Sequence, residues 1–207
     1  GIMSLTGEPG GPPIRPGASF GDIIAGLFAC IGILTALIER DKSDEGQLID
    51  MSMLDCQVAV MENAFERYFA TGEVPKALGT RHPIFTPFQV FETKDIYIAL
   101  AIVGHQWPLF CANIDHIELI DDARFETGEL RTQNYSLLEP ILTEAMKTRT
   151  TQEWLEEFEK VEIPCAPVNT VDKVAIDPQI LAREMIVEIL QPGVGKVKVV
   201  NTPIKLS

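Results

Sequence analysis

The longest apolar stretch of this 207-residue chain runs from Ile23 to Ile38. Its large apolar residues fall on every side of a helix, which is the pattern of a helix buried in a protein core. Small residues recur within it at spacings of three and four, namely Ala25, Ala29, Gly32 and Ala36. Such a stripe lets another backbone pass closely. The stretch therefore predicts a long buried helix that packs tightly against a neighbouring segment.

A loop between Gly17 and Gly21 leads into this helix and ends in Asp22, where an N-cap residue is expected. An N-cap carboxylate accepts backbone N–H groups and lies at the positive end of the helix dipole, so it stays ionised. The simpler interpretation is that Asp22 only caps the helix, because Asp is among the commonest caps. The alternative is a nucleophilic carboxylate at the mouth of a cleft, where glycines let a substrate approach the backbone. The pattern leaves both interpretations open.

Beyond the helix, the chain changes between alternation and helical spacing. Residues Gln47–Met53 alternate, which predicts a strand, and Leu54–Ala70 return to helical spacing and stop at Gly72. Residues 71–87 form a connector rich in Pro and Gly. The elements predicted after it are the strands Phe88–Phe91 and Ile96–Val103, the helices His105–Ile114, Leu130–Lys147 and Thr151–Val161 (with Thr151 as cap), a helix beginning at Asp177-Pro178, and a hairpin of Ile186–Leu190 with Lys196–Val200. This order predicts an α/β fold with a small, largely antiparallel sheet in its second part.

The charge of the chain narrows the classes of function. Its formal net charge is −13 at pH 7, which argues against non-specific binding to nucleic acid or to anionic membranes. The apolar helix is slightly short for a membrane span and contains glycines. We therefore expect no nucleic-acid partner and no membrane partner. An anionic ligand would need a local basic site, and the cations nearest to Asp22 in sequence are Arg15, Arg40 and Lys42.

Cysteine and histidine spacing predicts neither disulfides nor a metal site. The four cysteines form no CxxC pair and lie mostly in apolar contexts: Cys30, Cys56, Cys111 and Cys165. With no signal peptide in this sequence, they are typical of reduced thiols in a cytoplasmic protein. The three histidines lack metal-ligand spacing: His82, His105 and His116. His82 stands out because Gly79-Thr80-Arg81-His82-Pro83 is a loop with two groups that can carry positive charge, although a solvated linker is the simpler interpretation.

Short motifs recur along the whole chain in a fixed order. They are Gly1-Ile2-Met3-Ser4-Leu5-Thr6-Gly7, Gly21-Asp22-Ile23-Ile24-Ala25-Gly26, Gly46-Gln47 with Met51-Ser52-Met53, Arg81-His82-Pro83 with Pro87-Phe88-Gln89-Val90-Phe91, Ile163-Pro164-Cys165-Ala166-Pro167-Val168, and Asp177-Pro178-Gln179. Together they resemble the class III CoA-transferases (the CaiB/BaiF family). That family includes formyl-CoA and carnitine CoA-transferases and the α-methylacyl-CoA racemases.

The resemblance implies that Asp22 is the family's nucleophile. In the family this carboxylate attacks an acyl-CoA thioester, giving a mixed anhydride and free CoA thiolate. The thiolate then forms an aspartyl-CoA thioester, and an incoming carboxylate completes the exchange. Acyl-CoA, CoA and carboxylates are thus implied as substrates, with no permanently bound cofactor. Gly21 accompanies Asp22, and the loop with Gly79, Arg81 and His82 corresponds to a loop near the family's active site.

The resemblance also implies a domain organisation and an assembly. Residues 1–70 correspond to part of a large, Rossmann-like CoA-binding domain whose N-terminal half is absent here. Residues 71–87 correspond to a linker, 88–185 to a small α/β domain with a mostly antiparallel sheet, and 186–207 to the start of a return linker. Family members form interlocked homodimers. Since little else in this sequence can cover the apolar helix, we expect the isolated chain to dimerise or aggregate.

Two alternatives to CoA transfer stay open from the sequence. A racemase or epimerase would use Asp22 as an acid or base on an α-carbon together with a histidine, and no histidine here matches that partner. A non-catalytic fragment would keep the fold without the N-terminal half that supplies most CoA contacts in the family. The sequence does not identify the acyl group.

Overall fold

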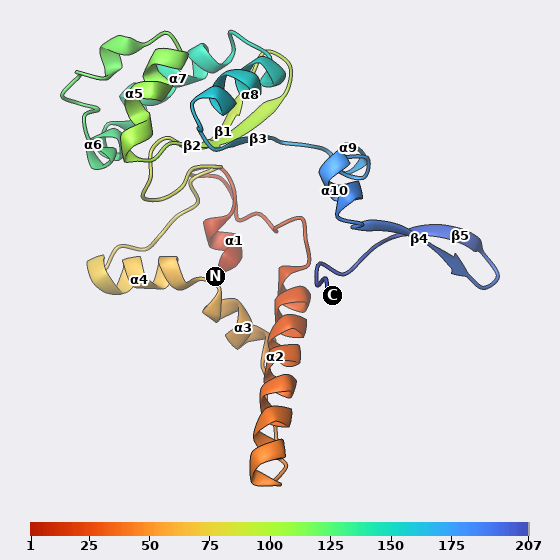
Figure 1. Ribbon diagram of the computed structural model, residues 1–207. Helices are drawn as coiled ribbons and strands as arrows, with labels where there is room; N and C mark the ends of the chain where they lie inside the picture. The colour runs from red at the N-terminus through yellow and green to blue at the C-terminus, as the bar shows by residue number, and fades with distance from the viewer. Residues whose placement is uncertain (207) are drawn as a thin grey trace. The chain divides into compact units, whose positions relative to one another are not determined.

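The computed structural model describes residues 1–206, in which helices are combined with a three-stranded and a two-stranded sheet (Figure 1). The chain divides into two compact units, Gly1–Gln89 and a second that begins at Val90. The α/β class and the small antiparallel sheets predicted from the sequence are confirmed. The assignment of residues 1–70 to a CoA-binding domain stays a prediction.

Helix α2 (Phe20–Ser43) is the apolar helix predicted from the sequence and the long orange helix of Figure 1. It is longer than predicted at both ends, because good helix formers such as Glu39 and Arg40 follow the apolar stretch. Its 24 residues span about 36 Å at 1.5 Å per residue. The helix ends where Asp44 adopts the left-handed conformation, with φ 58°, and donates its N–H to the Arg40 carbonyl at 2.8 Å.

The small-residue stripe of α2 faces the segment that follows the helix in sequence. Ala25 is buried, and Ala29, Gly32 and Ala36 are half-buried. A Cβ atom added at Gly32 would lie 3.4 Å from Cγ2 of Ile49, so the glycine permits this approach. The close packing predicted for the stripe is confirmed.

The remaining sides of α2 are exposed within this chain. Ile23, Leu27 and Ile38 are 54%, 60% and 61% exposed. The prediction of a helix buried on all sides is therefore wrong for residues 1–206, because the following segment covers only the stripe of small residues. By length and composition alone α2 could also cross a membrane, a test that core helices of soluble proteins pass as well.

The strand predicted at Gln47–Met53 is absent from the described chain. Residues 47–52 are in neither sheet, and α3 (Met53–Ala59) begins at the last of the predicted positions. The Ser52 hydroxyl caps α3 by accepting the N–H groups of Leu54 and Asp55 at 3.1 and 3.3 Å. An alternating segment forms a strand only beside another strand, and the described chain offers none here.

The helix predicted at Leu54–Ala70 is two helices, α3 and α4 (Glu62–Thr71). Helix α4 ends as predicted at Gly72, which has φ 73° and donates its N–H to the Tyr68 carbonyl at 2.8 Å. A short helix, α1 (Ile2–Leu5), precedes the Gly/Pro-rich segment and was not predicted. Four residues are too few to show a hydrophobic period.

The larger sheet has the order β1 (Phe88–Glu92), β2 (Tyr97–Ala101) and β3 (Cys165–Pro167). Both predicted strands of the first pair are present, joined by a tight turn in which the Thr93 N–H donates to the Ile96 carbonyl at 2.9 Å. Strand β3 pairs antiparallel with β2, and Ile98 lies opposite Pro167. Alternate residues of β2, Ile98 and Leu100, face the core.

Helices pack on this sheet around one core. Trp107, Phe110 and Leu142 are almost fully buried there, and Trp154 stacks on Phe158 with ring centroids 5.2 Å apart. The prediction that both tryptophans fill the core is confirmed. The helical elements of this unit up to β3 are η1 (Gly104–Gln106), α5 (Trp107–Asn113), η2 (Ile117–Leu119), α6 (Gly128–Gln133), α7 (Tyr135–Met146) and α8 (Thr151–Lys160).

Helix ends in this unit correct two predicted boundaries. The helix predicted at Leu130–Lys147 breaks at Asn134, whose amide donates to the carbonyls of Leu130 and Arg124 at 3.0 and 3.1 Å. The N-cap of α8 is Thr150 rather than Thr151, because Thr150 forms a capping box with Glu153. The hydroxyl of Thr151 is instead buried against that of Thr93 at 2.7 Å.

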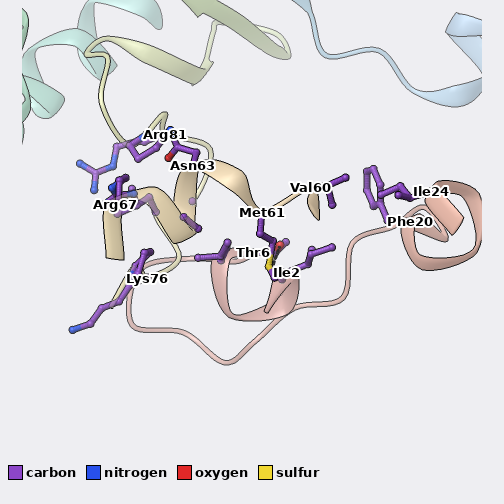
Figure 2. Close-up of a pocket in the computed structure, with 16 residues that line it drawn as sticks. Ile2, Thr6, Phe20, Ile24, Val60, Met61, Asn63, Arg67, Lys76 and Arg81 are labelled. Atoms are coloured by element: carbon purple, nitrogen blue, oxygen red, sulfur yellow. Dashed lines mark hydrogen bonds between the residues drawn. The ribbon is translucent and has the colours of Figure 1, made fainter. Parts of the chain in front are cut away.

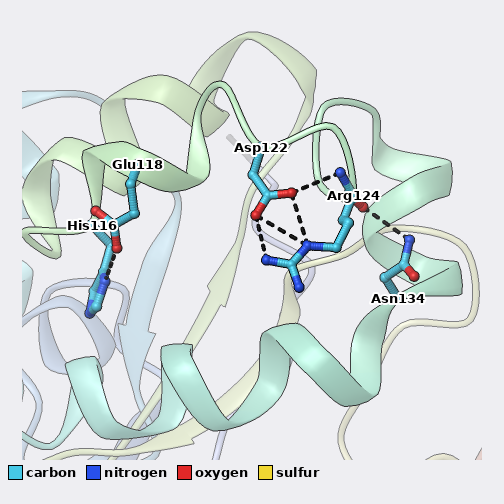
Figure 3. A network of polar contacts seen from close by, with 5 residues as sticks. All are labelled: His116, Glu118, Asp122, Arg124 and Asn134. Atoms are coloured by element: carbon cyan, nitrogen blue, oxygen red, sulfur yellow. Dashed lines mark hydrogen bonds and ion pairs between the residues drawn. The ribbon is translucent and has the colours of Figure 1, made fainter.

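The turn before α6 is held by local ion pairs (Figure 3). Arg124 binds the carboxylate of Asp122 through two nitrogens, the shorter contact being 2.6 Å, and this lowers the pKa of Asp122. His116 Nδ1 lies 2.7 Å from Glu118 and lowers the pKa of that carboxyl. These exposed pairs shape the turn and contribute little to stability.

The last elements are α9 (Val171–Val174), α10 (Pro178–Ala182) and the hairpin of β4 (Ile186–Gln191) with β5 (Gly195–Val200). Asp177 caps α10 and Pro178 is its first residue, as predicted. The predicted hairpin is confirmed, with Ile186 opposite Val200.

Candidate active site

Asp22 is the third residue of α2 and not its N-cap, which is Ser19. The N-cap prediction is wrong because Phe20 and Gly21 already belong to the helix. The side chain of Asp22 is exposed in the first turn. It thus still lies at the positive end of the helix dipole, which stabilises a carboxylate.

Ser19 occupies the N-cap without capping, since its side chain accepts no backbone N–H. Its hydroxyl instead accepts a long hydrogen bond of 3.5 Å from Nη2 of Arg15. An N-cap serine that caps normally contributes about 1 kcal/mol to a helix. The loop before α2 therefore uses this hydroxyl to contact Arg15, at the cost of the usual cap.

A pocket of about 400 Å³ opens at Asp22 and lies entirely within the first unit. Arg15 and Asp22 are the charged side chains among its lining residues in the described chain, and Ser19 and Gln57 add polar groups. The apolar part of the lining consists mainly of Ile2, Met3, Phe20, Leu54, Val58 and Met61. Its volume lies in the range of sites for small molecules.

Gly21 keeps the wall of this pocket thin. A Cβ atom added there would meet Nε2 of Gln57 at 3.4 Å and the Met53 methyl at 3.7 Å. Gly21 therefore lets α3 approach the first turn of α2 beside Asp22. The structure thus brings together Gly21 and Asp22, the two predicted site residues closest in sequence.

A second pocket, of about 580 Å³, adjoins the first and holds two other predicted site residues, Gly79 and Arg81. Figure 2 shows Arg67, Lys76 and Arg81 gathered at one end of it, with Phe20 and Ile24 at the other. The two pockets share Ile2, Phe20 and Met61 in their linings, so they are neighbours within the first unit.

Gly79 occupies a position that requires glycine. It has φ 65°, its N–H donates to the Gly7 carbonyl at 2.9 Å, and an added Cβ atom would lie 3.3 Å from the Glu8 carboxylate. The connector is thereby tied to the chain before α2.

His82 lines neither of these pockets and organises its own loop. Its Nδ1 accepts the N–H groups of Ile84 and Phe85 at 3.2 and 3.0 Å, and its own N–H donates to the Phe88 carbonyl at 2.8 Å. Its ring stacks on those of Phe85 and Phe88, with centroids 5.0 and 4.9 Å away. The prediction of His82 as a substrate-loop residue therefore lacks support from its position, and the solvated-linker alternative is wrong because the ring is half-buried.

Replacement of His82 should separate loop structure from chemistry. His82→Ala removes the acceptor of two N–H groups and both ring contacts, and we expect it to lower the free energy of unfolding by about 1–2 kcal/mol. His82→Asn offers an amide oxygen near the position of Nδ1 and should recover part of this loss. Chemical denaturation of the two variants measures the difference. Equal losses in both would show that the Nδ1 hydrogen bonds contribute nothing.

The basic candidates named from sequence proximity separate in space. Arg15 reaches the Asp22 pocket, whereas Arg40 and Lys42 lie in the last turn of α2, about 30 Å away at 1.5 Å per residue. Gln57, Arg67 and Lys76 line the two pockets and were not predicted, because no local pattern relates them to Asp22. Residues 1–206 contain no cluster of three His, Cys, Asp or Glu side chains suited to a metal ion.

Comparison with known proteins gives a consistent family. The chain is 34% identical to human succinyl-CoA:glutarate CoA-transferase over 208 residues, covering 100% of this chain and 48% of the relative. It is also 34% identical to the acetyl-CoA:oxalate CoA-transferase of Acetobacter aceti, covering 52% of that protein. The chain thus spans about half the length of the curated relatives it matches.

Solved structures agree with the sequence matches. The crystal structure of a CAIB/BAIF family protein from Brucella suis superimposes with a TM-score of 0.80 at 37% identity, covering 100% of this chain and 53% of that one. Residues 1–207, the whole chain, match CoA-transferase family III. The chain therefore belongs to CoA-transferase family III.

Proposed function

We propose that the natural protein transfers CoA from an acyl-CoA to a free carboxylic acid, with Asp22 as the covalent acceptor. The observation that supports this most is the position of Asp22, in the first turn of a long helix and at a pocket that also holds one cation. The names of the relatives, all CoA-transferases among those compared above, support the same reaction class.

The reaction consists of four acyl exchanges. A carboxylate oxygen of Asp22 attacks the thioester carbonyl, the C–S bond breaks, and a mixed anhydride and CoA thiolate result. The thiolate then attacks the Asp22 carbonyl of the anhydride, which gives an aspartyl-CoA thioester and releases the donor carboxylate. The acceptor carboxylate attacks this thioester and forms a second anhydride. The returning thiolate attacks the acceptor's carbonyl, so that the new acyl-CoA leaves and Asp22 is regenerated.

Each attack creates a negative oxygen on a tetrahedral carbon. The first N–H groups of a helix have no acceptor within the helix, so those around Gly21 and Asp22 are suited to stabilise this charge. The helix dipole keeps Asp22 ionised and therefore nucleophilic. The adjoining apolar lining excludes water, which would otherwise hydrolyse the anhydride.

For the acceptor we propose a short dicarboxylic acid. The names of the relatives include glutarate, oxalate and succinate as partners of CoA transfer. Acyl-CoA and CoA are then substrates, and the proposal needs no bound cofactor. An interlocked homodimer would provide cover for the exposed sides of α2, and both this assembly and a cytoplasmic location stay predictions.

Substrate exchange tests the proposed reaction. The natural protein, given succinyl-CoA and isotopically labelled glutarate, should form labelled glutaryl-CoA and equimolar succinate, both measured by mass spectrometry. Butyrate, which lacks the second carboxylate, should be a poorer acceptor. Release of free CoA without transfer, or exchange of only the α-proton of a branched acyl-CoA, would contradict the proposal, the latter in favour of the racemase alternative.

A further inference from the structure

Arg15 lies in the Asp22 pocket and has no role in the steps described above. We infer that its guanidinium binds the carboxylate that attacks or leaves Asp22, so that it determines the affinity for the acceptor acid. This inference rests on the proposed function and assigns a substrate-binding residue to it.

The local geometry places Arg15 on the same side of the helix as Asp22. Nη2 of Arg15 lies 3.5 Å from the Ser19 hydroxyl, and Ser19 is the N-cap while Asp22 is the third helical residue. Side chains at these two positions are close neighbours, which is why an N-cap and a third residue can bond reciprocally in a capping box. The guanidinium is thus held within the reach of a small ligand bound at Asp22.

The hydrogen bonding of the loop supports a positioning role for Ser19. Its hydroxyl is available to Arg15 because it does not cap α2. Arg15 also makes no ion pair with a carboxylate among the residues that the structure describes. Its charge is therefore not neutralised by a fixed partner and can serve a ligand.

The charge in the pocket gives the strongest argument. In the resting state the negative charge is on Asp22. After the first attack Asp22 is neutral in the anhydride and the charge is on the CoA thiolate, and after the second it is on the departing carboxylate. One mobile negative charge is present throughout, and Arg15 is the single basic side chain that lines this pocket in the described chain. A fixed cation beside a moving anion stabilises every state of the exchange.

The rest of the lining makes this cation necessary. Apolar side chains such as Phe20, Leu54 and Met61 form most of the wall, and a carboxylate enters such surroundings only with a partner for its charge. Arginine suits this role because its planar guanidinium binds a carboxylate through two parallel hydrogen bonds. The ligand class of the subsite is therefore a small carboxylate, held opposite the carbonyl of modified Asp22.

The test compares Arg15→Gln and Arg15→Lys with the unmodified natural protein, using succinyl-CoA and glutarate. We expect Arg15→Gln to raise the KM for glutarate at least about 10-fold, because one partner of a charged pair is lost. The KM for succinyl-CoA should change less than about 3-fold, and hydroxylamine should still trap an Asp22 adduct with succinyl-CoA alone. Arg15→Lys keeps the charge without the fork and should give an intermediate KM for glutarate.

Arg40→Gln is the matched control, since it also removes one arginine from α2 or its flanks but lies in the last turn and pairs only with exposed Asp41. It should leave both KM values unchanged. An unchanged KM for glutarate in Arg15→Gln, with Asp22 still trapped in the unmodified protein, would overturn the role of Arg15 alone. Equal rises in both KM values together with a lower melting temperature would also overturn it, in favour of a purely structural role. Failure to trap Asp22 in the unmodified protein would overturn the proposed function and this inference together.

Discussion

Asp22→Asn should abolish CoA transfer by the natural protein while leaving its fold intact. An amide cannot form the anhydride, and loss of a covalent nucleophile commonly reduces kcat by about 10³-fold or more. Asn has nearly the same shape as Asp and the side chain is exposed, so melting temperature should change little. The rate of glutaryl-CoA formation and a thermal melt measure the two effects.

Asp22→Ala distinguishes this account from the capping interpretation. If Asp22 capped α2, the alanine variant would lose about 1 kcal/mol of stability. Because Ser19 is the N-cap and Asp22 makes no capping hydrogen bond, we expect a smaller loss of about 0.5 kcal/mol, from the helix dipole alone. Near-normal transfer by either variant would place the nucleophile elsewhere.

Trp154→Ala should strongly destabilise the second unit. Trp154 is 1% exposed, stacks on Phe158, and donates its Nε1–H to the Met146 carbonyl at 2.8 Å. Replacement by alanine leaves a large cavity and an unpaired buried carbonyl, so we expect the free energy of unfolding to fall by about 3–5 kcal/mol. Urea denaturation followed by circular dichroism measures this loss.

Two further variants check the cause of that effect. Trp154→Phe keeps most of the aromatic volume and loses the hydrogen bond, so its loss should be clearly smaller. Lys160→Ala, on the same helix, removes only an exposed pair with Glu157 and should change stability by less than about 0.5 kcal/mol. A loss below about 1 kcal/mol for Trp154→Ala would contradict the assigned core.

The second unit was largely predictable because its signals are local. The strands β1 and β2, the Asp177 cap and the β4–β5 hairpin follow from alternation, turn residues and capping chemistry within a few positions. The predictions failed where a partner decides the outcome. Residues 47–53 alternate like a strand but have no strand to pair with, and α2 has the composition of a core helix without a surrounding core among the described residues.

The candidate site was predictable only in part. Asp22 and Gly21 could be found from a glycine-flanked carboxylate before an apolar helix, and the family resemblance gave the carboxylate its role. Gln57 lies beside Gly21 because α3 folds back onto α2, and no local pattern contains that information. His82 attracted attention by its chemistry, yet its hydrogen bonds show that it stabilises the loop.

The central claim is that Asp22 becomes covalently modified during transfer. The most direct measurement is to mix the natural protein with succinyl-CoA, add hydroxylamine, and sequence the peptides by mass spectrometry. We predict an aspartyl hydroxamate at Asp22, formed with acyl-CoA, absent without it, and absent in Asp22→Asn. A hydroxamate at another carboxylate, or transfer at full rate with no trapped residue, would contradict the account.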